Sequence, residues 1–359
     1  MAAGQRQTVR ANMRPKVRVV PEGEMPVVDC AGSAAEVGRA LGYIWRDTLQ
    51  MSALRAPADT KPWWTRTGCK KLVNKLAPYL PQLYENMAKY AGVPLWATAV
   101  DMHNDDIAEP DGCTSFAITP SHTLDGVPIS GQTKDNSLTR AYQFQVLRLR
   151  FNDGTPDHLS LTYPGWLFGH GFVRGGCSIF RNTIYNENPG NGLPFSVFGL
   201  LALHCKTVGE VVKLVKDHGV RMCFHITVAD EHGGVVGIEN TAYGAFVLKP
   251  KQGIYTHANC IFGSKKACAV EGSSEHFARP DSLHRTSRLR ELLAEKGKRL
   301  TAQEAMYALA DRIGSPRGIS RTENNTIITS ACIVAQPTKG LLHVTRGSAA
   351  ENWPVTYSL

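Results

Sequence analysis

The first hundred residues carry the spacing of helices. Between residues 72 and 90, large apolar side chains recur at steps of three and four residues, which places them on one helical face. We therefore predict one helix over 72–90, ended by Gly92 and Pro94, another over 95–102 and an earlier one over 34–42. Core packing accounts for these faces, so this part of the chain is predicted to be mainly helical.

Beyond Gly112 the pattern becomes that of strands, with two pairs of helices between them. Asp-Gly pairs at 125–126 and 153–154 predict tight turns between neighbouring strands. The order of these segments predicts two antiparallel sheets covered by helices, a four-layer α+β sandwich. Strands are predicted over 113–119, 127–131, 144–151, 158–163, 177–186, 224–230, 234–239, 326–334 and 340–345, and helices over 195–203, 208–217, 287–295 and 302–312.

Composition narrows the class of protein. Of the 359 residues, 43% are hydrophobic and 20% charged, which is typical of a globular protein with an ample core. No stretch approaches the roughly 20 apolar residues of a membrane span, and no apolar segment follows the N-terminus as in a secretory signal. The sequence therefore predicts no membrane partner.

The net charge of +9 does not predict nucleic-acid binding. About half of it lies in residues 1–20, which hold five basic residues and no acidic one, and the other basic residues are scattered without a recognised binding motif. We interpret residues 1–20 as a frayed basic leader. A transit peptide is the alternative, although this segment lacks the serines typical of one.

Nine cysteines, an odd number at irregular spacings, favour a reducing compartment, and we expect the cytoplasm. Most should be buried thiols, so a reactive one must be found by its context. Cys113 follows Gly112 where the helical part gives way to the strands. The chain could be cut there without dividing an element.

A cut at Gly112–Cys113 would give the sulfur a base of its own. A thiol with a pKa of about 8.5 is mostly protonated at neutral pH, and no histidine flanks Cys113. An N-terminal amine, with a pKa of about 7.7–8, could take the proton. Before the cut, the same thiol could attack the Gly112 carbonyl to form a thioester that water opens, and glycine tolerates the strained backbone that this requires.

Several short segments occur in the order and spacing of a known family. Asp111-Gly112-Cys113-Thr114 is followed by Gly-Gln-Thr-Lys-Asp at 131–135, Tyr-Asn at 185–186, Thr-His-Ala-Asn at 256–259 and Ser-Arg at 320–321. The chain resembles the isopenicillin N acyltransferase family of the N-terminal-nucleophile hydrolases. It departs from the family's usual residues at Val173, Thr133 and Cys260, where asparagine, asparagine and histidine are usual.

The resemblance implies an αββα fold and a self-activating enzyme without metal or organic cofactor. Residues 1–112 would form a small chain that stays bound to a large chain of residues 113–359, and the substrate would be an acyl amide or acyl thioester. Hydrolysis is favoured over acyl transfer, with coenzyme A as an alternative acyl donor. The implied site comprises the nucleophile Cys113, Asp135 to orient its amine, Asn186 and Asn259 as oxyanion donors, and Arg321 to steady Asp135 or a substrate carboxylate. Apart from the resemblance, Trp166, Phe168 and His170 are candidates for an aromatic wall of the acyl pocket, with ordinary strand-and-turn packing as the alternative interpretation.

Other interpretations remain open on the sequence alone. Asp135 could be a turn residue, Asn186 part of a polar loop, Asn259 a cap and Arg321 a surface ion pair. A zinc site formed by His257, Cys260, Cys268 and His276 is a further alternative, although the spacing matches no recognised zinc pattern. The alternative outside enzymes is a binding protein that retains the fold without catalysis.

Overall fold

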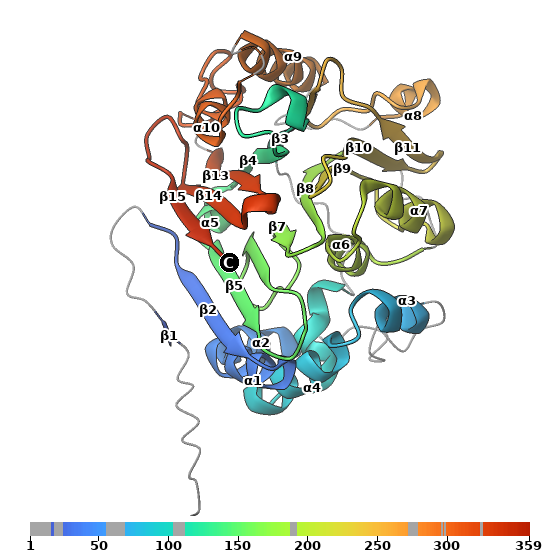
Figure 1. The fold of residues 1–359 in the computed structure, drawn as a ribbon, viewed down its shortest axis with the longest axis vertical. Coiled ribbons are helices and arrows are strands. Elements are labelled where there is room, and N and C mark those ends of the chain that lie inside the picture. Colours follow the sequence, from blue (N-terminus) through green and yellow to red (C-terminus); the bar gives the residue numbers. More distant parts are fainter. Residues whose placement is uncertain are drawn as a thin grey trace, which may run out of the picture.

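The computed structural model describes residues 16–17, 24–54, 69–102, 112–186, 192–271, 279–295, 297, 299–323 and 326–359. Two sheets lie between helices, which cover both outer sides (Figure 1). Within these ranges, the larger sheet has nine strands in the order β1 (Lys16–Val17), β2 (Val27–Gly32), β5 (Gln145–Phe151), β6 (His158–Thr162), β7 (His170–Val173), β8 (Cys177–Thr183), β9 (Phe224–Asp230), β10 (Val235–Thr241) and β11 (Gly244–Leu248).

The smaller sheet carries the predicted cleavage site. Its described strands are six, in the order β12 (Ile254–His257), β3 (Gly112–Ile118), β4 (Ile129–Ser137), β13 (Ile327–Gln336), β14 (Leu341–Arg346) and β15 (Val355–Ser358). All of its neighbouring strands are antiparallel. The expectation of two wholly antiparallel sheets is wrong at one place in the larger sheet, where β2 and β5 run parallel. Parallel neighbours need a long crossover, and residues 33–144 provide it.

Three hydrophobic clusters define four layers. One joins the larger sheet, through residues such as Leu147 and Ile226, to the helices on its outer face. A second lies between the sheets, where Leu161 and Phe180 meet Ile333 and neighbouring residues of β13 and β14. A third joins the smaller sheet to α9 (Arg279–Glu295) and α10 (Ala302–Leu309). The predicted αββα sandwich is therefore confirmed.

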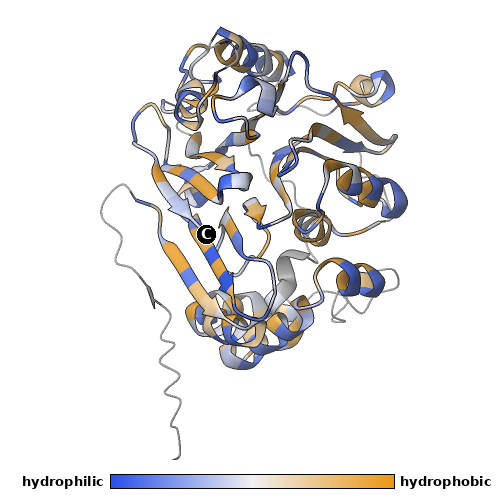
Figure 2. Ribbon diagram, in the orientation of Figure 1, coloured by the Kyte–Doolittle hydropathy of each residue, from blue (hydrophilic) through white to orange (hydrophobic). Residues whose placement is uncertain are grey.

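The helices on the larger sheet come from both sides of the predicted cut. Figure 1 shows α9 and α10 on the opposite side of the molecule from the N-terminal helices. Every residue of α6 is buried, and Figure 2 shows it hydrophobic along its length. The layer consists of α1 (Ala34–Ile44), α2 (Arg46–Ala53), α3 (Cys69–Leu76), α4 (Leu80–Ala91), α6 (Phe195–Leu203) and α7 (Val208–His218).

The single helix predicted over 72–90 is wrong. The chain forms α3 and α4 with a break at 77–79, because Pro78 lacks an amide hydrogen and disfavours helical backbone at the residue before it. Residues 95–102 form a 3₁₀ helix, η2 (Leu95–Met102), which packs against α4. The strand predicted over 127–131 instead continues to Ser137, so the whole segment 131–135 lies on β4.

Candidate active site

Cys113 and Asp135 are brought together by the antiparallel pairing of β3 with β4. In this register Gly112 lies opposite Asp135, and Cys113 opposite Lys134. The side chain of Cys113 is buried. Gly131 permits the close approach of β13 to β4, because a β-carbon there would lie 2.2 Å from the carbonyl oxygen of Ile333. Two of the predicted site residues thus lie on adjacent strands of one hairpin.

The peptide groups on both sides of the Cys113 α-carbon are fixed by side chains. Its N–H donates to Oδ1 of Asn259 at 3.1 Å. Its carbonyl oxygen accepts from Nδ2 of Asn182 at 3.0 Å and from Nη1 of Arg285 at 2.8 Å. Arg285 also donates through Nη2 to Oδ1 of Asn259 at 2.8 Å. The backbone at Cys113 is therefore held rigidly before any cut.

Asn259 lies at the predicted site and presents its oxygen to it. Its Nδ2 donates to the carbonyl of Thr183 at 2.7 Å, while its Oδ1 accepts from Cys113 and Arg285. The orientation follows from this network, since exchanging oxygen and nitrogen would oppose donor to donor. In the unbroken chain, Asn259 therefore acts as an acceptor for the nitrogen that a cut would release.

Asp135 is buried in a pocket of opposite charge. Its Oδ1 accepts from the hydroxyl of Thr329 at 2.7 Å, and its Oδ2 lies 3.4 Å from Nε of Arg321, which is also buried. Burial raises the pKa of the Asp135 carboxyl above 3.8, although Arg321, Arg285 and Lys134 act to lower it. The predicted contact between Asp135 and Arg321 is present.

The structure does not place Asn186 as predicted. Its Nδ2 donates to the carbonyls of Ala267 and Val270, at 3.0 and 3.4 Å, at the end of α8 (Lys265–Ala269). The strand predicted over 177–186 ends at Thr183, so Asn186 lies beyond it. The asparagine on this strand that donates to Cys113 is Asn182.

The three residues of the predicted pocket wall have different neighbours in the structure. Phe168 packs edge-on against Phe195 of α6, with ring centroids 5.5 Å apart, and belongs to the core beneath the helices. Trp166 contacts Tyr163 edge-on at 5.4 Å. His170 begins β7, and its Nδ1 accepts a long hydrogen bond from the backbone N–H of Arg181 at 3.5 Å. The contacts of Phe168 and Trp166 fit the packing interpretation, because each ring packs edge-on against an aromatic neighbour.

Three further side chains reach Cys113 or its peptide: Lys134, Asn182 and Arg285. Nζ of Lys134 lies 3.6 Å from the Cys113 sulfur, although the lysine is only 3% exposed. Burial, together with the charge of Arg321, lowers the pKa of Arg285 to about 10. Lys134 belongs to the segment 131–135, in which the sequence predicts a role for Asp135 alone. No local pattern identifies Arg285, which is 172 residues from Cys113.

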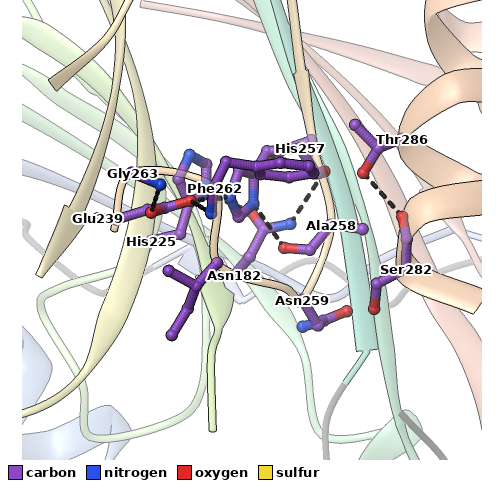
Figure 3. Close-up of polar contacts among 12 residues, drawn as sticks. Asn182, His225, Glu239, His257, Ala258, Asn259, Phe262, Gly263, Ser282 and Thr286 are labelled. Atoms are coloured by element: carbon purple, nitrogen blue, oxygen red, sulfur yellow. Dashed lines mark hydrogen bonds and ion pairs between the residues drawn. The ribbon is translucent and has the colours of Figure 1, made fainter. Parts of the chain in front are cut away.

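A buried histidine pair lies next to this site (Figure 3). Nε2 of His257 is 2.8 Å from Oε1 of Glu239, and its Nδ1 is 2.7 Å from the carbonyl oxygen of Ala258. Both ring nitrogens of His257 thus lie within hydrogen-bond distance of an oxygen atom. The backbone N–H groups of Phe262 and Gly263 also donate to Glu239, at 2.9 and 2.7 Å.

His225 stacks on His257 with ring centroids 3.5 Å apart. Burial and the neighbouring His257 hold its pKa well below 6.5, so His225 is neutral. Its Nε2 lies 2.8 Å from the Tyr255 hydroxyl and its Nδ1 lies 3.3 Å from Oδ1 of Asn182. A chain of hydrogen bonds therefore runs from Tyr255 through His225 and Asn182 to the Cys113 carbonyl.

This arrangement opposes the zinc alternative. Both nitrogens of His257 are already engaged, and burial raises the pKa of the Cys260 thiol to about 12. His276 lies outside the described residues. In the part of the chain that the structure describes, no group of three or more His, Cys, Asp or Glu side chains is arranged to hold a metal ion.

The four-layer sandwich, with a buried cysteine at the start of β3 in the smaller sheet, is the architecture of the cysteine hydrolases and acyltransferases of the N-terminal-nucleophile class. The family model described as acyl-coenzyme A:6-aminopenicillanic acid acyl-transferase matches residues 125–350, more than half of the chain. The chain belongs to this family, whose members are enzymes. The matched range begins after Cys113, so it does not include the predicted cleavage site.

Solved structures with a similar course of the chain include two hydrolases. A variant of conjugated bile acid hydrolase from Clostridium perfringens aligns with 14% identity over 69% of this chain and 97% of its own, with a TM-score of 0.44. Penicillin V acylase from Agrobacterium tumefaciens aligns with 11% identity over 69% and 86%, with a TM-score of 0.42. A search of curated proteins gave no match.

Proposed function

We propose that the chain is a precursor that cleaves its own Gly112–Cys113 bond and then opens acyl amides with the freed Cys113. One observation carries this proposal most strongly. The peptide nitrogen of Cys113, which the cut would turn into an α-amine, is buried and held by Oδ1 of Asn259. The site therefore already contains an acceptor that would orient the amine beside its own thiol.

After the cut, the α-amine takes the proton of the Cys113 thiol, and the sulfur attacks the carbonyl carbon of the substrate. The amide C–N bond breaks, the departing amine receives the proton, and an acyl-enzyme remains. Water then attacks the acyl-enzyme and releases the acid. Asp135 and Asn259 orient the α-amine, Arg321 steadies the Asp135 carboxylate, and Arg285 with Asn182 fixes the Cys113 carbonyl.

The oxyanion of the substrate requires donors at the site. The second N–H of Asn259 is our candidate, because the amide already lies beside Cys113. A single such donor is typically worth about 3 kcal/mol of barrier. We no longer assign this role to Asn186, since its amide supports the end of α8.

The two pieces, residues 1–112 and 113–359, would stay together after the cut. Val37 of α1 and Leu83 of α4 belong to the same buried cluster as Leu147 of β5 and Phe198 of α6. The parallel ladder between β2 and β5 adds backbone hydrogen bonds across the two pieces. Separation would expose this shared core, so association does not depend on the broken bond.

We infer that the substrate is an acyl amide and that hydrolysis predominates, because water is always present whereas transfer needs a pocket for the acceptor. An acyl thioester of coenzyme A is the second candidate donor, and the family's description favours it. We also infer a reducing compartment such as the cytoplasm, since all nine cysteines are free thiols. Within the described residues, no helix combines the length and apolar character needed to cross a bilayer.

The test is acylation of one sulfur. Purified protein is incubated with a panel of acyl amides and acyl-coenzyme A, quenched in acid and digested for mass spectrometry. The expected result is an acyl group on Cys113 with release of the amine or thiol, and neither event in Cys113→Ala. If Cys113 is inert to the whole panel and to iodoacetamide, the binding-protein alternative replaces the enzyme.

A further inference from the structure

The self-cleavage proposed above lacks a base for its first step. Before the cut, the nitrogen of Cys113 is an amide, whose lone pair is delocalised and cannot take a proton. The α-amine that serves the mature enzyme does not yet exist. A separate group in the unbroken chain must therefore receive the thiol proton.

We propose that Lys134 is this group, and that its amine receives the Cys113 proton during self-cleavage and returns it to the departing nitrogen. Its Nζ lies 3.6 Å from the sulfur, within hydrogen-bond distance for a thiol. The contact is built into the fold, because β3 and β4 pair Cys113 directly with Lys134. The inference rests on the proposed self-cleavage.

The surroundings favour the neutral amine that this role needs. Lys134 is 3% exposed, and burial disfavours an ammonium ion. Arg321, which precedes β13, pairs with the Asp135 carboxylate, and the charges of Arg285 and Lys134 also act on that carboxylate. One carboxylate therefore faces three cationic side chains, so loss of charge from the lysine relieves repulsion. Both arginines are poor bases, which leaves the lysine as the member of this trio that can exchange a proton.

Other titratable groups nearby are occupied or remain protonated. His257 has both nitrogens engaged and His225 is linked to Tyr255 and Asn182. On β13, burial raises the pKa of the Cys332 thiol to about 12. Asp135 is paired with Thr329 and Arg321.

The step balances without a further reactant except water. The S–H proton passes to Nζ, and the thiolate adds to the Gly112 carbonyl carbon. The C–N bond to Cys113 breaks as Nζ returns the proton to the nitrogen, leaving a thioester and a free amine. Water then opens the thioester, one of its protons returns to sulfur, and the new carboxylic acid gives its proton to the amine.

The test is the pH profile of cleavage in the full chain, with Lys134→Met and Lys134→Arg. Methionine removes the charge and the base, whereas arginine keeps the charge and removes the base. Both should be about 100-fold slower than wild type at pH 7, a typical effect of losing a general base. Both should then speed up about tenfold per pH unit towards pH 8.5, as hydroxide replaces the base. The matched control is Lys339→Met, which removes a surface lysine that is paired with Asp125 and should cleave at the wild-type rate.

Cleavage of either variant at the wild-type rate, with the wild-type pH profile, overturns the role of Lys134. If one variant does not fold, as judged by thermal melting, the other decides. A rate that falls in the methionine variant but not in the arginine variant also overturns the base and leaves only an effect of charge. Failure of self-cleavage itself is recognised separately, because wild type and Lys339→Met would then also remain uncut.

Discussion

Replacing Arg285 with methionine removes the side chain that holds the Cys113 peptide from α9. The guanidinium donates to three acceptors at 2.8 Å, the Cys113 carbonyl, Thr114 Oγ1 and Asn259 Oδ1. A hydrogen bond from a charged donor typically contributes about 1.5–3 kcal/mol, so the loss of the three bonds costs about 6 kcal/mol. Methionine carries no charge that the fold must bury, and this offsets part of the loss. The fall of the Arg285 pKa from 12.5 to about 10 corresponds to about 3 kcal/mol.

The expected net loss is therefore about 3 kcal/mol in the free energy of unfolding, or about 5 °C in the thermal midpoint for a chain of this size. Stability is measured in the Cys113→Ala background, so that every sample is one uncut chain. Cleavage is measured separately with Cys113 intact, and we expect it to slow at least tenfold because the peptide is no longer held.

The matched control is Arg288→Met on the same helix. Arg288 is partly exposed and pairs with Asp311 at 2.8 Å, so its loss should cost no more than about 1 kcal/mol and leave cleavage unchanged. If Arg285→Met melts within 1 °C of its parent and cleaves at the wild-type rate, the guanidinium does not support this site and the reasoning is refuted.

Three further predictions concern burial and position. Asn182→Ala should slow cleavage because it removes a donor to the Cys113 carbonyl. Asn186→Ala should cleave at the wild-type rate and lose about 1 kcal/mol of stability, because its amide supports the end of α8. A gel time course in which Asn186→Ala is the slower variant contradicts the assignment. Asp135→Asn should abolish cleavage and lower the thermal midpoint of the Cys113→Ala protein, since it leaves the buried Arg321 without the carboxylate that it pairs with, and an unchanged midpoint would argue against this. Three buried histidines have depressed pKa values in the fold, so the unfolded chain binds more protons than the folded chain below pH 6.5. The free energy of unfolding should therefore fall by up to about 4 kcal/mol per pH unit as the pH is lowered from 6 to 5. Urea titrations at several pH values measure this, and a flat profile refutes the prediction. The three histidines are His158, with a pKa of about 3, His204, with a pKa of about 4, and His225.

Much of the fold could be predicted from local patterns. The helix over 195–203 and the strand over 224–230 have the predicted bounds, because α6 is apolar throughout and β9 precedes a turn containing Gly233. The order of elements was enough to predict the layers. Short strands such as β2 and β12 were missed, since their few residues show no sustained alternation. The parallel β2–β5 pair depends on a long crossover that no local pattern records.

The sequence predicted the part of the site that lies on one hairpin, but not the contacts that come from elements distant in the chain. Cys113 and Asp135 meet because one hairpin joins them. Arg285 reaches Cys113 from α9, and its helical neighbours give no sign of that contact. The resemblance implied Asn186 through Tyr-Asn at 185–186, whereas the asparagine that donates to the Cys113 carbonyl is Asn182 on β8, which ends at Thr183.

The most direct test of the central claim is the intact mass of the freshly purified protein, read together with the N-terminal sequence of each species. Self-cleavage predicts two co-purifying pieces of about 12 and 27 kDa, the larger beginning at Cys113, and a single uncut chain for Cys113→Ala. A wild-type protein that remains one chain of 359 residues from pH 6 to 9, or that is cut at another bond, would contradict the account.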